Sequence, residues 1–334
     1  MGNKNKNNPM MNNIERNINN CFISASLQTF LHLEDFIFDV ISLKIKDDKK
    51  ENMKLTYEFK QLINEYKNND YIINNINPLK IKKILSEENE KYRTNNQQDA
   101  NEFVTLFLNE MMKEVKGIGI KNLKKINSPI DKKEKMAFEK LELHFFGKNQ
   151  SFITDLFYGR FKKEIICPNN HIIKVSFEAY NIIQLPIIDK KENENDIQEN
   201  TIEYFLKKFQ DKRVIESEIE CIECNKKDIY YTKTTIYNLP FYIILLLNNQ
   251  SIQYNEHFTI EVKNFIEREN NNNGKYELVG VIGYYGNNKN GHYFTKCKIN
   301  NGQWIYYDSD IKKRIKDYLL IDKRTDTMLF FKKL

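Results

Sequence analysis

The fold of this chain is decided near its start, by the stretch Asn19-Asn20-Cys21-Phe22-Ile23-Ser24-Ala25-Ser26-Leu27-Gln28. Apolar side chains recur after the cysteine at helical spacing, so we expect a helix that begins at Cys21 and buries one face. A thiol at a helix N-terminus has a lowered pKa, because the unpaired N–H groups and the helix dipole favour the thiolate. The stretch therefore predicts a reactive cysteine, whereas an isolated cysteine beside a helix is usually a small core residue.

A second informative region lies near the other end of the chain. It contains Gly291-His292-Tyr293 in a strand-like run, followed by Trp304-Ile305-Tyr306-Tyr307-Asp308. A cysteine nucleophile needs a histidine as its base and a third group that orients the histidine. We therefore predict that Cys21 is a nucleophile, His292 its base and Asp308 the orienting carboxylate, as in a cysteine hydrolase.

Length and composition indicate one large domain. The chain has 334 residues, is 40% hydrophobic and contains 22 Phe and 19 Tyr, which suffices for a substantial core. The net charge of +6 is modest and the basic residues are scattered in small groups rather than gathered on one element. A modest and scattered positive charge affects solubility and does not by itself indicate a binding partner, so we expect no nucleic-acid binding.

Nothing in the sequence predicts export or membrane insertion. The N-terminal residues lack the apolar core of a signal peptide, and the longest apolar run, Leu239 to Leu247, is too short to span a bilayer. Five cysteines without a secretory signal favour thiol or metal chemistry in a reducing compartment over disulfides. We expect a soluble monomer in the cytoplasm, the nucleus or both.

Hydrophobic periodicity divides the chain into two parts. Residues 1–11 read as a disordered polar tail, residues 12–150 are mainly helical, and residues 151–334 are mainly strands. One helix follows Gln97-Gln98-Asp99, with an Asn as its cap and Asp99 in its first turn. Three polar stretches predict surface loops, 117–135, 189–200 and 267–275. The predicted strands are 174–177, 229–237, 242–247, 277–283, 293–299 and 328–331.

Several of these motifs together resemble the catalytic domain of the ubiquitin-specific proteases, which are papain-like cysteine deubiquitinases. The stretch around Cys21 is similar to the Cys box of that family, and Gln97-Gln98-Asp99-Ala100-Asn101-Glu102-Phe103 is similar to its QQDAxEF segment. Leu156-Phe157-Tyr158-Gly159 before Cys167 resembles the approach to the fingers. The region from Tyr276 through His292 to Asp308 resembles the His box, and Met328-Leu329-Phe330-Phe331 the terminal strand.

The resemblance implies an α+β, papain-like cysteine protease fold over residues 12–334, with a helical thumb, a β-rich palm and β fingers. It implies a thiol-dependent deubiquitinase whose partners are ubiquitin and ubiquitinated proteins, and which needs no cofactor for catalysis. It also implies that Gln97, Asp99 and Glu102 bind the ubiquitin tail, where carboxylates suit the tail's arginines. The alternative is that the two acids are ordinary first-turn residues favoured by the helix dipole.

The Cys box departs from the family pattern. The family places Gly three residues before the cysteine and Asn five residues before it, where the Asn side chain contributes to the oxyanion hole. Here those positions hold Ile18 and Arg16, and Asn17 is one residue out of place. Asn17 is therefore the candidate oxyanion donor, and loss of such a donor typically lowers the rate by ~10²–10³. This leaves open a catalytically weak or inactive ubiquitin-binding scaffold, besides a protease for a ubiquitin-like modifier.

A metal site is predicted in the fingers. Cys221 and Cys224 form a CxxC half-site, which fits a tight zinc knuckle. The other half in the family is a second CxxC, but here Cys167 is followed by Asn170 where the second thiolate belongs, and then by His171. Cys167, His171, Cys221 and Cys224 thus predict a structural zinc site. The alternative is a degenerate site that has lost its metal.

Overall fold

The computed structural model describes residues 19–68, 78–118, 129, 131–187, 201–215, 220–225, 229–247, 258–262, 266, 274–286, 291–308, 311–316 and 325–334. The predicted tail over residues 1–11 and the predicted loop over 189–200 lie outside these ranges. The division into thumb, palm and fingers at about residue 150 stays a prediction. Among the described residues, no helix is both long enough and apolar enough to cross a membrane.

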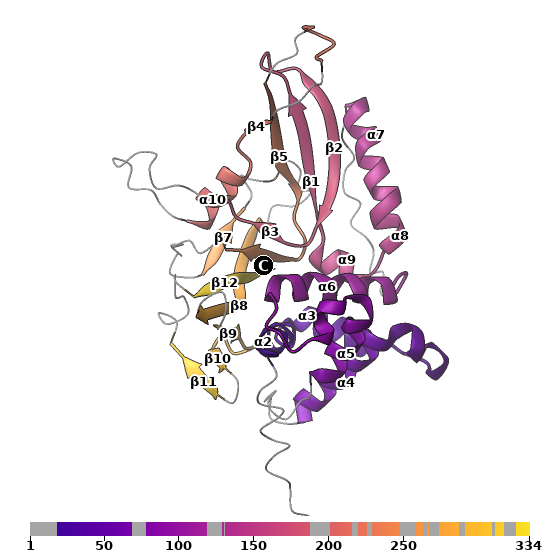
Figure 1. Cartoon of the computed structure of the whole chain (residues 1–334), viewed down its shortest axis with the longest axis vertical. Coiled ribbons are helices and arrows are strands. Elements are labelled where there is room, and N and C mark those ends of the chain that lie inside the picture. The colour runs from indigo at the N-terminus through magenta and orange to yellow at the C-terminus, as the bar shows by residue number, and fades with distance from the viewer. Residues whose placement is uncertain are drawn as a thin grey trace, which may run out of the picture.

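The first half of the described chain is helical. Its α-helices and short 3₁₀ or π elements follow in the order α2 Cys21–Phe30, α3 Glu34–Ser42, η1 Asp47–Met53, α4 Lys54–Asn68, α5 Leu79–Glu88, η3 Glu90–Arg93, α6 Ala100–Glu114, α7 Lys132–Leu141, η4 Glu142–Phe146, α8 Gly147–Asn149 and α9 Phe152–Phe157. One more helix, α10 Ile202–Phe209, lies among the strands. Figure 1 shows α2 to α6 gathered at the lower right, with α7 rising along the right-hand edge.

Strands dominate after residue 158. They are β1 Gly159–Ile166, β2 Ile172–Tyr180, β3 Ile183–Gln184, β4 Arg213–Ile215, β5 Tyr230–Asn238, β6 Tyr242–Leu246, β7 Thr259–Glu261, β8 Lys275–Gly286, β9 Gly291–Lys298, β10 Trp304–Asp308, β11 Ile311–Ile315 and β12 Asp326–Lys333. A four-stranded sheet has the order β2-β1-β5-β4, and a larger sheet the order β11-β10-β9-β8-β12-β6-β3, with β7 paired to β8. In Figure 1 the smaller sheet rises above the larger one.

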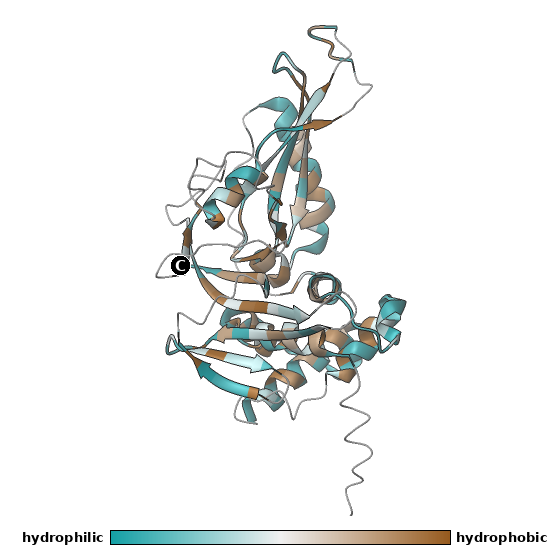
Figure 2. Cartoon of the chain, turned by 60° about the vertical axis from the view of Figure 1, so that its left-hand side comes forward, coloured by the Kyte–Doolittle hydropathy of each residue, from teal (hydrophilic) through white to brown (hydrophobic). Residues whose placement is uncertain are grey.

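The main core joins the helices to one face of the larger sheet. Its centre is aromatic: the Phe30 ring stacks on Phe107 of α6 at 5.0 Å and meets Phe330 of β12 edge-on at 6.3 Å. A second cluster of buried side chains, which includes Phe205 and Phe331, covers the other face. Strands β6, β8 and β12 are consequently apolar on both faces, as expected for central strands. Figure 2 shows hydrophobic residues concentrated where the helices meet this sheet.

Helix α2 lies very close to the sheet. The hydroxyls of Thr29 on α2 and Thr295 on β9 are hydrogen-bonded at 2.8 Å, both fully buried. A Cβ atom at Gly280 would lie 2.9 Å from the Thr29 methyl group, so only glycine permits this approach. The packing fixes α2, and hence Cys21 at its start, relative to β8 and β9.

Two local predictions are wrong. The stretch 117–135 was expected to be a loop, but α7 begins at Lys132, with the Asp131 side chain accepting from the Glu134 N–H at 3.0 Å. Charged residues dominate this helix, and Phe138 is its one fully buried side chain. The cap of α6 is Asp99 itself, which accepts from the Asn101 N–H at 2.6 Å, rather than an Asn. An ionised carboxylate satisfies the free N–H groups and also complements the helix dipole.

Candidate active site

Cys21 is the first residue of α2, as its sequence context predicts. The preceding residue, Asn20, is the N-cap but makes no capping hydrogen bond with its side chain. The first N–H groups of α2 therefore keep their positive potential near the thiol, which favours a thiolate or another anion there. The phenyl ring of Phe22 anchors this end of the helix against Tyr92 and Phe103, with ring centroids 6.0 and 5.9 Å apart.

His292 and Asp308 lie on neighbouring strands. His292 follows the first residue of β9, and Asp308 ends β10, which pairs with β9. The Nε2 atom of His292 lies 2.6 Å from Oδ1 of Asp308. This contact leaves Nδ1 as the ring nitrogen available to the thiol of Cys21, which is hydrogen-bonded to the His292 side chain. The structure thus brings all three predicted residues together in the order thiol, imidazole, carboxylate.

The electrostatics of this cluster favour charge separation. Burial alone raises the pKa of the Cys21 thiol, but hydrogen bonds from the His292 ring and the Tyr293 backbone N–H outweigh it, and the pKa is lowered. The hydrogen bond to Cys21 raises the pKa of His292 against the opposing effect of burial, and Asp308 adds to the increase. Both shifts bring the pKa values of the thiol and the imidazole towards each other and so favour proton transfer from Cys21 to His292, and the thiolate is the form in which a cysteine is nucleophilic.

The second oxygen of Asp308 is also occupied. Its Oδ2 accepts hydrogen bonds from the Tyr306 hydroxyl at 2.8 Å and from the Tyr285 hydroxyl at 3.2 Å. The carboxylate is only 12% exposed. Sequence analysis predicted neither tyrosine as a site residue, although Tyr306 lies two residues before Asp308 and so shares its face of the strand.

Gln97 lies in the site but is held by the backbone of β9. Its Nε2 donates to the Gly291 carbonyl at 2.5 Å, and its Oε1 accepts from the Gly291 N–H at 3.3 Å. The same Nε2 lies 3.8 Å from the Cys21 sulfur. A Cβ atom at Gly291 would lie 1.8 Å from the Tyr284 hydroxyl oxygen, so any other residue there would displace the Tyr284 ring. Gln97 therefore links the helical part of the chain to the start of the histidine strand.

The two acidic residues at the start of α6 are placed differently from one another. Asp99 uses one carboxylate oxygen as the helix cap, and its charge acts on the Tyr293 hydroxyl next to the site. Glu102 is half exposed and forms an ion pair with Lys91. A guanidinium arriving at Glu102 would have to displace that ammonium group. The candidate oxyanion donor Asn17 lies outside the described residues.

Four potential metal ligands meet at the far end of the four-stranded sheet. The ligand atoms of Cys167, His171, Cys221 and Cys224 all lie within 4.8 Å of one another. The sulfurs of Cys167 and Cys224 are 3.9 Å apart, and the Cys221 sulfur lies 3.6 Å from Nδ1 of His171. A tetrahedral zinc with bonds of about 2.3 Å to sulfur has edges of about 3.8 Å, so the cluster matches the size of such a site.

Asn170 does not take part in this cluster. Its backbone adopts a positive φ of 64°, and its side-chain oxygen accepts from Lys212 at 2.8 Å. The left-handed turn brings the next residue, His171, towards the thiols. The cluster is therefore Cys₃His, and the position that the family fills with a second thiolate is occupied by an asparagine engaged elsewhere.

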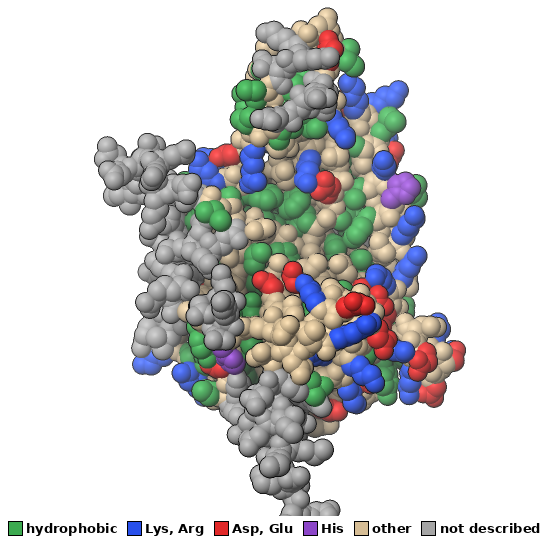
Figure 3. Space-filling view, viewed as in Figure 1, with side chains coloured by type: hydrophobic (Ala, Val, Ile, Leu, Met, Phe, Trp, Pro, Cys, Tyr) green, Lys and Arg blue, Asp and Glu red, His purple; other side chains and the backbone are tan. Residues whose placement is uncertain are grey.

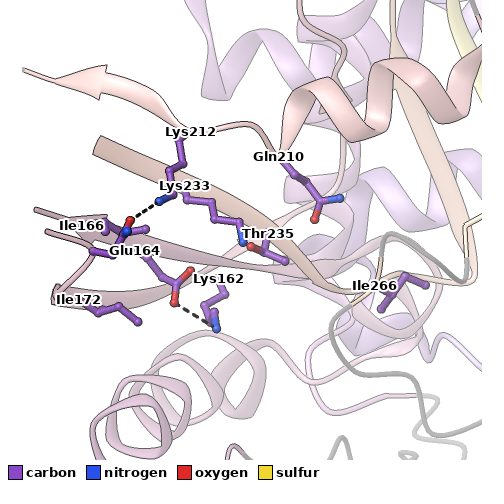
Figure 4. A pocket seen from close by; sticks show the side chains of 10 residues that line it. Lys162, Glu164, Ile166, Ile172, Gln210, Lys212, Lys233, Thr235 and Ile266 are labelled. Carbon is purple, nitrogen blue, oxygen red and sulfur yellow. Dashed lines mark hydrogen bonds and ion pairs between the residues drawn. The ribbon is translucent and has the colours of Figure 1, made fainter. Parts of the chain in front are cut away.

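A hollow of about 500 Å³ lies on the four-stranded sheet, beside the C-terminal end of α10. Its walls are mostly charged or polar, and some of these groups pair with one another, as Lys212 does with Asn170. The ammonium of Lys162 contacts Glu164 at 3.3 Å and Glu134 at 3.2 Å, and Figure 4 shows Lys162 directed towards Glu164. None of the residues that line the hollow belongs to the cluster around Cys21.

Comparison with known proteins decides the family. A sequence profile described as ubiquitin carboxyl-terminal hydrolase matches residues 13–331. The chain belongs to the ubiquitin carboxyl-terminal hydrolase family. This confirms the resemblance to the ubiquitin-specific proteases that the sequence motifs indicated.

Curated relatives are similar at a moderate level. The chain is 26% identical to ubiquitin carboxyl-terminal hydrolase 9 of Saccharomyces cerevisiae over 279 residues, which is 77% of this chain and 34% of the relative. It is 23% identical to ubiquitin carboxyl-terminal hydrolase Usp2 of Drosophila melanogaster, over 85% of this chain and 30% of that protein. The chain thus spans about a third of the length of these relatives.

Solved structures with a similar fold are also known. The SAGA DUB module Ubp8/Sgf11/Sus1/Sgf73 bound to ubiquitin aldehyde contains a chain that matches with a TM-score of 0.65 and 19% identity, over 95% of this chain and 68% of that one. A further structure of the module, bound to monoubiquitin, gives a TM-score of 0.68 at 19% identity, over 95% and 67%. The predicted α+β, papain-like fold is therefore confirmed.

Proposed function

We propose that the chain is a thiol-dependent deubiquitinase that hydrolyses the bond after the C-terminal glycine of ubiquitin in ubiquitin–protein conjugates. One observation carries the proposal: the His292 ring lies between the Cys21 thiol and the Asp308 carboxylate, with 2.6 Å from Nε2 to Oδ1. The sequence relatives are named as ubiquitin carboxyl-terminal hydrolases, and one structural relative was solved bound to ubiquitin aldehyde.

The reaction follows from the arrangement of these groups. The Cys21 thiolate attacks the carbonyl carbon of the terminal glycine, and the carbonyl oxygen becomes an oxyanion. The His292 imidazolium then protonates the amine that leaves, and a thioester remains on Cys21. His292, now neutral, takes a proton from water, whose hydroxide attacks the thioester and releases the carboxylate product. Asp308 keeps the ring in place and stabilises its charged form throughout.

The oxyanion requires hydrogen-bond donors next to Cys21. The N–H groups of the first turn of α2 are donors that the fold places there, and the Gln97 Nε2 amide lies 3.8 Å from the Cys21 sulfur. We propose Asn17 as an additional side-chain donor, on the strength of its place four residues before the cysteine.

Recognition of the ubiquitin tail is proposed for Gln97, Asp99 and Glu102. Asp99 stands beside the site with one carboxylate oxygen engaged by its own helix, which leaves the other for a guanidinium. Glu102 must first give up its ion pair with Lys91, so it contributes less to binding than Asp99 does. Gln97 contributes through the Gly291 backbone that it holds, next to the path to Cys21.

A protein the size of ubiquitin needs a broad docking surface. Figure 3 shows hydrophobic side chains gathered across the middle of one face, over the lower part of the four-stranded sheet and above α6. Charged side chains lie mainly around this area. An apolar centre with a charged margin is the usual composition of a protein-binding surface.

We further propose one structural zinc ion bound by Cys167, His171, Cys221 and Cys224. The chemistry of the donor set and its spacing fit a closed four-ligand site, which has no open position for catalysis. The ion would tie the β1–β2 turn to the segment that precedes β5. None of the five cysteines forms a disulfide, and we propose an intracellular site of action in the cytoplasm, the nucleus or both.

The proposal is tested with a fluorogenic substrate in which the dye is attached to the ubiquitin C-terminus. The wild-type chain should release the dye, whereas Cys21→Ala should bind ubiquitin with similar affinity and release none. Cys297→Ala is the matched control, because Cys297 is buried in β9 and its sulfur contacts Thr295 and the Gln28 carbonyl rather than the triad, and it should retain turnover.

Two other outcomes decide between the alternative functions. Binding of ubiquitin without turnover by the wild-type chain would indicate a non-catalytic scaffold. Turnover of a ubiquitin-like substrate in preference to ubiquitin would indicate a protease for that modifier. Either result would overturn the proposed function.

A further inference from the structure

We propose that Tyr285 and Tyr306 are positioning residues that clamp the Asp308 carboxylate, so that Oδ1 is held towards His292. The inference deepens the proposed function and rests on it, since it concerns the same triad. The two carboxylate oxygens of Asp308 have different partners. Oδ1 meets the His292 ring at 2.6 Å, whereas Oδ2 accepts from both phenols, at 2.8 Å from Tyr306 and 3.2 Å from Tyr285.

Strand register explains why these hydroxyls converge. In the β8–β9 ladder, Tyr285 lies directly opposite His292. On β10, Tyr306 precedes Asp308 by two residues, so both side chains lie on one face of the sheet. Residues from three successive strands therefore surround the carboxylate, and each arrives from a position that the sheet fixes.

The rings that carry the hydroxyls are held by packing. Phe294 lies between them, stacked with Tyr285 at 5.8 Å and tilted against Tyr306 at 5.2 Å. On the outer strand β11, the Lys313 ammonium lies 4.9 Å from the centre of the Tyr306 ring. Within the described ranges, the titratable and charged groups that the structure places around Asp308 are His292, Tyr285 and Tyr306, with Lys313 behind Tyr306. Tyr306 has Phe294 and Lys313 as neighbours, whereas Tyr285 is 44% exposed, so the Tyr306 hydroxyl is the better preorganised of the two.

The clamp has a specific consequence for the chemistry. A carboxylate held at one oxygen alone rotates about its χ2 bond, which is broad for Asp. Two donors on Oδ2 remove that freedom and keep the carboxylate plane aligned with the imidazole. An aligned carboxylate stabilises the imidazolium and fixes which ring nitrogen faces Cys21. Loss of the clamp should therefore lower the rate of the chemical step without changing substrate binding.

The test compares Tyr285→Phe, Tyr306→Phe and the double variant, each of which keeps the ring and removes only the hydroxyl. With a fluorogenic ubiquitin substrate, kcat should fall about threefold to tenfold for Tyr306→Phe and less for Tyr285→Phe, with KM unchanged. The double variant should lose more than the product of the single losses, because each single variant retains one phenol. Tyr57→Phe on α4 is the matched control, and it should behave like the wild type.

A second readout does not depend on ubiquitin. The rate of alkylation of Cys21 by iodoacetamide reports the fraction of thiolate. The acid limb of the pH profile of this rate should move to higher pH in the double variant, because a poorly held carboxylate stabilises the imidazolium less. A double variant with wild-type kcat and a wild-type alkylation profile would overturn the clamp. A loss in kcat that the Tyr57→Phe control reproduces would also overturn it. If the wild-type chain turns over no ubiquitin substrate, the proposed function fails, while the alkylation profile still tests the clamp.

Discussion

Acidification should destabilise the protein through His32, at the C-terminal end of α2. Its Nδ1 lies 2.7 Å from the Gln28 carbonyl oxygen, and because a carbonyl only accepts, Nδ1 carries the hydrogen. Nε2 is then an acceptor, 3.0 Å from the Tyr307 hydroxyl and 3.1 Å from the Tyr66 hydroxyl. The imidazole is therefore held neutral. Burial, the main cause, lowers its pKa from 6.5 to about 4.

The sign and size of the effect follow from linkage. Above about pH 6.5, His32 is neutral in both the folded and the unfolded chain, so it contributes nothing to the pH dependence. As the pH falls through 6.5 towards 4, His32 binds a proton in the unfolded chain but not in the folded chain, so the free energy of unfolding decreases. A separation of about 2.5 between the two pKa values corresponds to about 3.4 kcal/mol, of which about 3 kcal/mol is lost by about pH 4 and the rest below it.

The assay is urea unfolding at a series of pH values, for the wild type and His32→Gln. Other groups titrate over this range, but they do so in both proteins and cancel in the difference. The wild type should therefore lose about 3 kcal/mol more than the variant between about pH 7 and about pH 4. His144→Gln is the matched control, because His144 is exposed, and it should follow the wild type. A stability difference between wild type and His32→Gln that stays constant with pH would refute the reasoning.

Three further predictions concern the tail site, the metal cluster and a buried ion pair. Replacing Asp99 and Glu102 by Arg should raise KM for ubiquitin substrates by a factor equivalent to ~1.5–3 kcal/mol for each carboxylate–guanidinium pair that is lost, and Asp99→Arg should be the more severe single change. An unchanged kcat/KM would indicate that both are ordinary first-turn acids. Protein purified without added metal should contain about one zinc per chain by elemental analysis, and Cys221→Ser should lower that content and the Tm; full stability without metal would indicate a degenerate site. Lys296 and Asp326 form a buried ion pair at 3.0 Å, so Lys296→Met should lower the free energy of unfolding in urea by ~3–5 kcal/mol. Adding Asp326→Leu should restore most of this loss, and an equal loss in the single and the double variant would contradict the prediction.

The parts of the fold that the sequence predicted are those with a strong repeating pattern. Helix α2 and the strands β6, β8 and β12 carry apolar runs long enough to identify them as buried elements. Cys21, His292 and Asp308 were predictable because each stands at a point where such an element begins or ends. The four metal-ligand candidates were predictable because ligand spacing on tight turns is a local property.

Other features depend on contacts between distant segments. Helix α7 has Phe138 as its one fully buried residue, which packs between Phe177 and Tyr237, so its mostly charged sequence looked like a loop. The two phenols on Asp308 required the register of three strands, which the sequence does not supply. The bond between Gln97 and Gly291 joins residues 194 positions apart and likewise has no local signal.

The most direct test of the account is the reaction of the purified chain with ubiquitin that bears a C-terminal electrophile, followed by peptide mapping of the adduct. The account predicts one covalent ubiquitin per chain, attached at Cys21, and slower labelling in Asp308→Asn because the carboxylate no longer stabilises the charged ring. Absence of an adduct, or its appearance on Cys167, Cys221, Cys224 or Cys297 with Cys21 unmodified, would contradict the assignment of Cys21 as the nucleophile.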